Sequence, residues 1–185
     1  NKYFADKVFL LPNIWMCFTA PEYEVKIEEL PAIKNKYITF GCFNNLSKIN
    51  NEVISLWSRI LTAIPKSKIF LKTKKLENSY LKETIINNFK KNNINSNSII
   101  LEGNSPRNEL LASYNKVDIA LDPFPYSGGT TSFEATWMST PVLTKKGFKF
   151  ISRSTESINH NVNMTDWIAK DDNEYVEKAI KFSTD

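Results

Sequence analysis

From residue 37 onward, short runs of β-branched and aromatic residues alternate with longer segments of helical periodicity. The run YITFGCF (37–43) has the composition of a buried strand. In NNEVISLWSRILTAI (50–64), apolar residues recur at helical spacing until Pro65 ends the pattern. The same alternation continues along the chain. It predicts further strands at 67–73, 98–103, 117–122, 141–145 and 166–169, and further helices at 78–92, 106–115, 130–139 and 172–183.

Strands that alternate with helices, with no hairpin dipeptides between them, predict βαβ units and a parallel sheet covered on both faces. Right-handed crossovers then give an α/β, doubly wound, Rossmann-like domain. Residues 1–35 lack this regularity and carry prolines at 12, 21 and 31. We therefore expect an irregular arm at 1–35 and one folded domain at 36–185.

Composition limits the classes of protein that remain. With 185 residues, 42% hydrophobic and 24% charged, the chain resembles a globular domain. Its net charge of +4 comes from scattered lysines without an aromatic stacking platform, which argues against nucleic acid. Cys17 and Cys42 lack metal-type spacing. There is no signal peptide and no apolar run of about 18 residues, so we expect a cytoplasmic protein away from membranes.

Ligands of doubly wound sheets bind at the carboxyl ends of the strands, and three segments there are unusual. The first is GCFNNLSKIN (41–50). Free N–H groups at a helix start, together with Lys48, suit phosphate oxygens. The spacing fits neither a Walker A loop nor a G-x-G-x-x-G turn. The alternative is an asparagine-rich turn with an exposed lysine.

The second segment, GGTTSFEA (128–135), contains two of the chain's five glycines. Gly128 and Gly129 would let a ligand approach the backbone closely. Thr130 and Thr131 are expected to cap the following helix. Glu134, about one turn further along, could accept hydrogen bonds from the two hydroxyls of a ribose. The alternative is an ordinary glycine turn with a threonine cap.

The third segment, EGNSPRNELL (102–111), could hold a base through its backbone, with Arg107 near a sugar or phosphate. A surface turn with Pro106 at the first helical position is the simpler interpretation. The first two segments follow different strands. Together they could bind one nucleotide diphosphate across a single crevice.

The stretches ITFGCFNNLSKIN, LWSRIL, SKIFLK and VDIALDPFPYSGGTTSFEATWMSTPV, with SR at 152–153, resemble the carboxy-terminal half of glycosyltransferase family 41. This family contains the protein O-GlcNAc transferases, their bacterial relatives and the Spindly-type O-fucosyltransferases of plants. The resemblance runs from FLLPNIWMCF to the end of the chain. It implies a GT-B architecture of two Rossmann-like lobes, in which the second lobe binds the nucleotide-sugar donor and residues 1–35 form the inter-lobe arm.

The resemblance also implies roles for residues of the first two segments. Asn45 and Lys48 would approach the donor diphosphate, and Lys48 would be the catalytic residue that stabilises charge on the leaving nucleotide. Gly128, Gly129, Thr130 and Thr131 would form the diphosphate-binding turn. Glu134 would bind the ribose hydroxyls, where animal members carry an aspartate.

In the third segment, the resemblance implies that Ser105 offers its backbone to uracil and that Arg107 replaces a lysine near the ribose. The chain departs from the family pattern at three further places. Leu110 and Gly129 stand where animal enzymes have histidines, and Ser139 stands where many members have glycine. The two histidine positions bear on which base and sugar are bound.

The resemblance implies an inverting glycosyltransferase that transfers a sugar, GlcNAc-like or hexose, from a UDP donor to a protein acceptor. No D-x-D pair for a divalent metal is present, and we expect neither a metal nor another cofactor besides the donor. His160, the single histidine, is interpreted as a surface or packing residue. The chain is expected to be a fragment whose full-length protein adds an N-terminal catalytic lobe and TPR-like repeats. The alternative function is a non-catalytic Rossmann-like nucleotide-binding or regulatory module.

Overall fold

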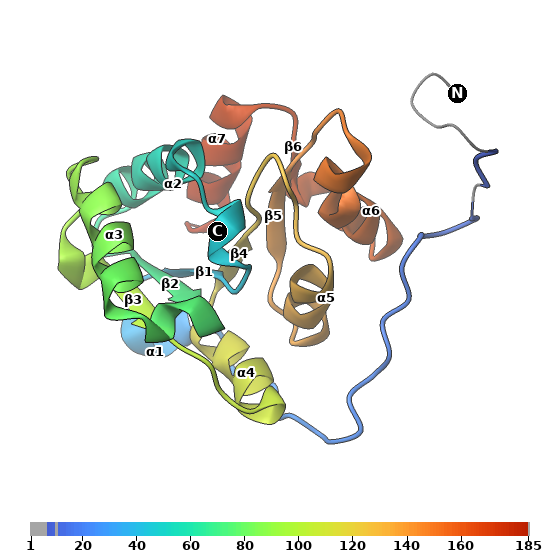
Figure 1. Ribbon diagram of the computed structural model, residues 1–185, viewed down its shortest axis with the longest axis horizontal. Helices are drawn as coiled ribbons and strands as arrows, with labels where there is room; N and C mark the ends of the chain where they lie inside the picture. Colours follow the sequence, from blue (N-terminus) through green and yellow to red (C-terminus); the bar gives the residue numbers. More distant parts are fainter. Residues whose placement is uncertain (1–6, 10, 185) are drawn as a thin grey trace.

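The computed structural model describes residues 7–9 and 11–184, and its centre is a parallel sheet of six strands in the order β3-β2-β1-β4-β5-β6. Every pair of neighbouring strands is parallel. Helices cover both faces of this sheet (Figure 1). The prediction of a doubly wound, Rossmann-like α/β domain is therefore confirmed.

All six predicted strands are present, several of them shorter than expected. The strands are β1 (Thr39–Cys42), β2 (Lys68–Lys72), β3 (Ile99–Glu102), β4 (Ile119–Leu121), β5 (Val142–Lys145) and β6 (Ile168–Ala169). The helices are α1 (Pro31–Asn35), α2 (Asn51–Ala63), α3 (Ser79–Lys90), α4 (Arg107–Ala112), α5 (Thr130–Trp137), α6 (Ser154–Asn161) and α7 (Asp172–Phe182). Short 3₁₀ turns lie at Leu46–Lys48 (η1), Lys74–Glu77 (η2), Ser96–Ser98 (η3), Ser113–Lys116 (η4), Phe150–Ser152 (η5) and Thr165–Trp167 (η6).

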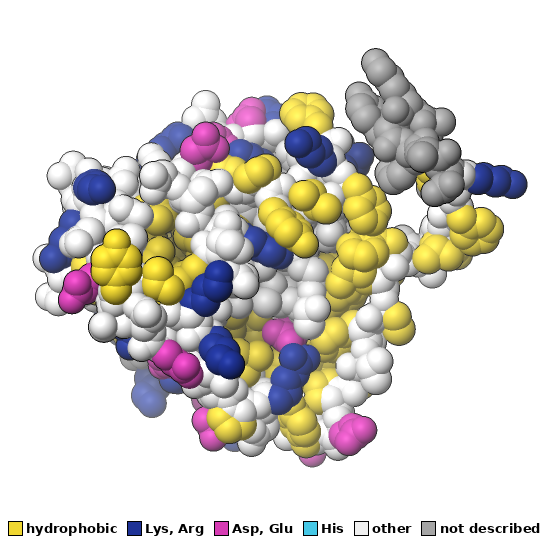
Figure 2. Space-filling model, viewed as in Figure 1, with side chains coloured by type: hydrophobic (Ala, Val, Ile, Leu, Met, Phe, Trp, Pro, Cys, Tyr) yellow, Lys and Arg dark blue, Asp and Glu magenta, His cyan; other side chains and the backbone are white. Residues whose placement is uncertain are grey.

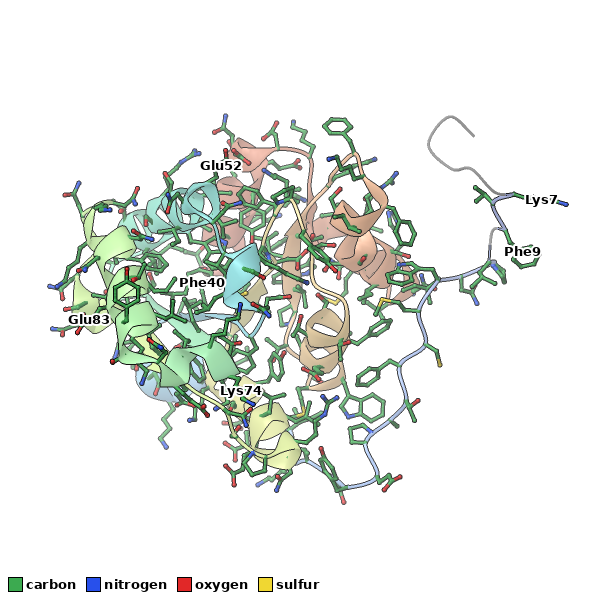
Figure 3. All side chains as sticks on the ribbon, viewed as in Figure 1. Lys7, Phe9, Phe40, Glu52, Lys74 and Glu83 are labelled. Carbon is green, nitrogen blue, oxygen red and sulfur yellow. The ribbon has the colours of Figure 1, made fainter. Side chains whose placement is uncertain are left out.

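The two faces of the sheet bury separate hydrophobic clusters. Phe40 and Trp57 belong to the larger cluster, where α2, α3 and α7 pack on one face. Phe43 and Tyr114 belong to the smaller cluster, which α5 and the segment from α4 to η4 cover on the other face. Figure 3 shows Phe40 in the interior, whereas Glu52 and Glu83 lie at the outer surface. Because strand side chains alternate between faces, consecutive residues of β2 serve both clusters, with Ile69 in the larger and Phe70 in the smaller.

The arm follows an extended path past α5 and α6, apart from the short helix α1 (Figure 1). The Trp15 and Phe150 rings lie 4.9 Å apart, and the Phe18 ring stacks on Phe133 at 5.4 Å. Hydrophobic side chains gather along this contact in Figure 2. Residues 11–30 thus contain no helix or strand, and they pack against the domain through aromatic side chains; residues 1–6 and 10 of the predicted arm lie outside the described residues.

Two helices were not predicted, α1 within the arm and α6 between β5 and β6. His160 lies in the last turn of α6 and is exposed, as expected of a surface histidine. Ser139, just after α5, has a φ of 57°, in the left-handed region that favours glycine. No helix within 7–9 and 11–184 has the length and apolar character needed to cross a membrane.

Candidate functional site

The strand order creates a crevice at the carboxyl ends of β1 and β4. The chain moves outward from β1 through β2 to β3, then returns to place β4 on the other side of β1. The loops after β1 and β4 consequently diverge to opposite faces, which is the switch point where open α/β sheets bind ligands. The first two segments singled out in the sequence meet here.

Lys48 joins the two loops. Its Nζ donates to the Ser127 carbonyl oxygen at 2.9 Å and to Asn44 Oδ1 at 3.2 Å. The same amine lies 4.0 Å from the centre of the half-exposed Tyr126 ring. Burial lowers the pKa of Lys48, and the nearby Asp122 carboxylate opposes that change. Lys48 is therefore half-buried between the two loops and not exposed on a turn, while its role at a donor diphosphate stays a prediction.

Asn44, and not Asn45, forms the contact across the crevice. The Asn44 side chain is buried and accepts hydrogen bonds from both Lys48 Nζ and Thr131 Oγ1. The exposed Asn45 instead caps η1 by accepting from the N–H and hydroxyl of Ser47, each at 3.1 Å. Asn45 therefore lies at the edge of the crevice, and its proposed approach to a diphosphate stays a prediction.

The start of α5 differs from the predicted threonine cap. Gly129 is the N-cap residue, and no side chain caps the helix. Thr130 is exposed at the first helical position, while the Thr131 hydroxyl donates to Asn44 at 3.0 Å. Thr130 and Thr131 thus do not cap α5. The uncapped helix end leaves amide dipoles directed at the crevice, which favours an anion.

Gly128 is required by the protein's own packing. A Cβ at this position would lie 2.1 Å from Ser132 Oγ and 3.0 Å from Asp122 Oδ1. Its N–H is also engaged, since it donates to Asp122 Oδ1 at 2.6 Å. The space beside this glycine, which the sequence assigned to a ligand, is therefore filled by the α5 turn and Asp122.

Gly129 faces the arm. A Cβ there would lie 3.2 Å from Met16 Cε, the flexible end of a side chain. This is the position at which the family resemblance leads one to expect a histidine in animal enzymes. In this chain, Met16 lies beside the position that such a side chain would occupy.

Asp122 is a buried carboxylate directly behind the crevice, with 1% of its surface exposed. Its two oxygens accept from Gly128 N–H and, at 2.7 Å, from the Thr144 hydroxyl. Burial raises the pKa of Asp122 from 3.8 to about 6, against the opposing effects of these hydrogen bonds and of Lys48.

Arg107, at the start of α4, and Glu134, on α5, form an ion pair. Arg107 Nη1 lies 2.6 Å from Glu134 Oε1, and the Glu134 side chain is only 2% exposed, whereas Arg107 is about half exposed. Burial raises the pKa of Glu134, and Arg107 limits that rise. The structure thus joins residues from the second and third segments, and interpreting the third as only a surface turn is incomplete.

The remaining predicted residues lie close to this pair in the chain. Ser105 is in the loop between β3 and α4, and its buried Oγ has no hydrogen-bond partner in the described part of the chain. Leu110 is half-buried within α4. Pro106 is the N-cap of α4, one residue before the predicted position. Over residues 7–9 and 11–184, no three His, Cys, Asp or Glu side chains form a group suited to a metal ion.

Taken together, the crevice combines a primary amine, a threonine hydroxyl and an uncapped helix start, which are groups that bind phosphate oxygens. The buried Glu134 carboxylate can accept hydrogen bonds from hydroxyl groups. Asn44, Asp122 and Met16 were missed by the site predictions. Asn44 is adjacent to Asn45, the predicted asparagine, and Asp122 is the last residue of the predicted strand 117–122. No local pattern marked Met16.

Comparison with protein families supports a common origin for most of the chain. Residues 25–185 match the model of glycosyl transferase family 41. An O-GlcNAc transferase mutant (K341M) of Thermobaculum terrenum has a similar structure, with a TM-score of 0.80 and 34% identity. That match covers 87% of this chain and 31% of the other.

Curated relatives give the same picture. The chain is 30% identical over 182 residues to a tomato (Solanum lycopersicum) protein described as a probable UDP-N-acetylglucosamine–peptide N-acetylglucosaminyltransferase SPINDLY. The Arabidopsis thaliana protein of the same description is 29% identical over 182 residues. Both matches cover 98% of this chain, which spans about a fifth of the length of these relatives.

Proposed function

Because the chain belongs to glycosyltransferase family 41, we propose that it is the donor-binding lobe of a glycosyltransferase and that its crevice binds a UDP-sugar. The supporting observation is the meeting of Lys48, the Ser127 carbonyl and the uncapped start of α5. These groups come from the two loops that diverge at the switch point. A diphosphate placed between them would be in contact with both loops.

In this proposal, Lys48 acts on the leaving nucleotide. Negative charge grows on the diphosphate as its bond to the sugar breaks, and a positioned ammonium group stabilises that charge. In the structure, Nζ already donates to two protein oxygens. The amine would exchange one of these contacts for a phosphate oxygen. Lys48 and the α5 dipole would neutralise the diphosphate without a metal or another cofactor.

Glu134 and Arg107 would bind the ribose. The Glu134 carboxylate is held in place by Arg107 and is buried under the crevice wall. A ribose hydroxyl could donate to the carboxylate oxygen that Arg107 leaves free. The buried, unpartnered Ser105 hydroxyl marks the loop whose backbone would contact the base.

The acceptor and the stereochemistry are also part of the proposal. The described relatives act on peptides, so we propose a protein acceptor and inverting transfer of a GlcNAc-like or hexose sugar. The chain spans about a fifth of those relatives. We accordingly assign the general base and the acceptor groove to an upstream lobe, with TPR-like repeats beyond it.

Calorimetry with UDP, ADP and GDP tests the donor assignment. We expect UDP to bind best, with a Kd of roughly micromolar to millimolar for an incomplete cleft. Lys48→Gln, which keeps a polar side chain without the charge, is the matched variant and should bind UDP more weakly. Equal binding of all three nucleotides, or binding of none, would refute the proposal.

The alternative is a nucleotide-binding module without catalysis. It shares the crevice, so nucleotide affinity alone does not separate the two. Transfer of radiolabelled sugar to protein by the full-length enzyme does separate them. Activity that disappears in Lys48→Ala would support the glycosyltransferase, and nucleotide binding without any transfer would support the module.

A further inference from the structure

Tyr126 lies on the loop between β4 and α5, and hydrogen bonds fix the backbone on both sides of it. Asn50 Nδ2, just before α2, donates to the Phe124 carbonyl oxygen at 3.2 Å. Ser127 is buried, and its N–H and hydroxyl both donate to the Ile151 carbonyl oxygen, at 3.2 and 2.9 Å. The fold thus fixes the point from which the Tyr126 side chain projects.

The Tyr126 ring is half-exposed and contacts the amine of Lys48. Lys48 Nζ lies over the ring, 4.0 Å from its centroid. At this distance the negative face of an aromatic ring attracts a cation. The two hydrogen bonds of the amine go to Asn44 Oδ1 and to the Ser127 carbonyl oxygen. The ring is therefore a third contact of the same amine, and it comes from the residue next to Ser127.

We propose that Tyr126 is a positioning residue of the crevice, whose ring face holds the Lys48 ammonium where a diphosphate oxygen can reach it. The donor part of this inference rests on the proposed function. The contact between the ring and the amine does not, because it is a property of the folded chain alone.

The need for such a residue follows from the flexibility of lysine. The four-carbon stem has many rotamers, so holding the amine in one place costs conformational entropy. When a phosphate oxygen replaces one of the two protein oxygens, Lys48 loses one of the contacts that hold it. The Tyr126 ring attracts the ammonium without using a hydrogen-bond acceptor, so it can keep its contact during this exchange.

Replacing the ring tests the contact directly. Tyr126→Leu removes the aromatic face and keeps an apolar side chain, whereas Tyr126→Phe keeps the face and is the conservative variant. Tyr80→Leu, at an exposed tyrosine of α3, is the matched control. In ¹H–¹³C spectra with labelled lysine, the Lys48 Cε protons are assigned by their loss in Lys48→Arg. The ring current should shift them upfield in wild type, Tyr126→Phe and Tyr80→Leu, and this shift should disappear in Tyr126→Leu.

The wild-type spectrum is decisive by itself and does not depend on how a variant folds. Lys48 Cε protons without an upfield shift in wild type would overturn the proposal. The same shift in wild type and Tyr126→Leu would also overturn it, because the shift would then come from another group.

Calorimetry with inorganic pyrophosphate and with UDP tests the consequence for the anion. We expect Tyr126→Leu to bind both ligands roughly two- to five-fold more weakly than wild type, which is the range for one exposed cation–π contact. Tyr126→Phe should restore wild-type binding. In a Lys48→Gln background, Tyr126→Leu should have no further effect, because the charge that the ring attracts is gone.

Two binding results would contradict the positioning role. Unchanged or tighter binding in Tyr126→Leu would mean that the ring is idle or competes with the ligand for Lys48. An equal loss in the Lys48→Gln background would mean that Tyr126 contacts the ligand itself.

Failure of the proposed function gives a different result. If wild type binds pyrophosphate but does not prefer UDP to ADP and GDP, the UDP assignment fails, while the pyrophosphate comparison still decides the role of Tyr126. If wild type binds none of these ligands, the crevice is not an anion site, and the positioning role of Tyr126 is refuted with it.

Discussion

Replacing Asp122 by asparagine should make the folded chain more stable at pH 8. The carboxyl is buried, and burial raises its pKa from 3.8 to about 6. A pKa difference of about 2 between the folded and unfolded states corresponds to about 3 kcal/mol, at 1.36 kcal/mol for each pKa unit. The ionised carboxylate thus costs stability, and the amide of asparagine avoids this cost.

The direction of the Asp122 pKa shift determines how the free energy of unfolding depends on pH. Because the folded-state pKa is raised, the proton favours the folded state, and this contribution is fully present below pH 3.8 and lost as pH rises through 6. The advantage of Asp122→Asn should therefore be largest at pH 7–8, at most about 3 kcal/mol, and should shrink toward pH 4.

Urea unfolding followed by tryptophan fluorescence, repeated between pH 4.5 and 8, measures this difference. Trp57 lies in the core and reports on global unfolding. Asp166→Asn, the same substitution at an exposed position, is the control. If Asp122→Asn were less stable than wild type by the same amount at every pH, the carboxylate would carry no burial penalty and the reasoning would be wrong.

Gly128→Val should lower the free energy of unfolding by about 1–3 kcal/mol or more, measured by urea titration, because its Cβ would overlap Ser132 Oγ. Gly129→Ala should fold normally, since only the flexible end of a methionine lies in the way. Glu134→Gln should weaken UDP binding in calorimetry but leave pyrophosphate binding unchanged, because its proposed partner is the ribose. Lys48→Ala should lower kcat of the full-length enzyme more than it weakens donor binding, by about 2–4 kcal/mol in the barrier.

Contrary results in Gly128→Val, Glu134→Gln or Lys48→Ala would each change the role assigned to that residue. A Gly128→Val chain of wild-type stability would mean that the turn can open without cost. Equal loss of UDP and pyrophosphate in Glu134→Gln would make this residue a support of the α5 turn. A Lys48→Ala enzyme with raised KM and unchanged kcat would make Lys48 a uniform binder and not a catalytic residue.

The sheet could be predicted because its signals are local. Each strand is a short apolar run between polar segments, and α2 carries both a cap at Asn50 and apolar residues at helical spacing. The helix α6 gave no such signal. In its sequence STESINHN, the polar residues Thr155, Glu156 and Asn159 are buried, so the apolar pattern that reveals a helix is missing.

The sequence predicted that two loops at strand ends lie together, but not which of their residues make the contact. The glycine, threonine and lysine of these loops indicated the two strand ends. The contacts between loops depend on distances across the sheet, which sequence spacing does not contain. For this reason the sequence pointed to Asn45, whereas Asn44 is the residue that contacts both Lys48 and Thr131. For the same reason the sequence did not predict the ion pair of Arg107 and Glu134, which are 27 positions apart in the chain.

The strand order also has a consequence for how the chain folds. Strands β1 and β4 hold the two halves of the sheet together through a short register, Phe40 with Ile119 and Gly41 with Ala120. These residues are far apart in the chain, so their pairing closes a long loop. Because closing a long loop costs chain entropy, this pairing is among the slower steps of folding. The bond from Lys48 to Ser127 spans 79 positions and forms only after this closure. A ligand that contacts both loops would therefore bind only the completed sheet and would slow the separation of its halves.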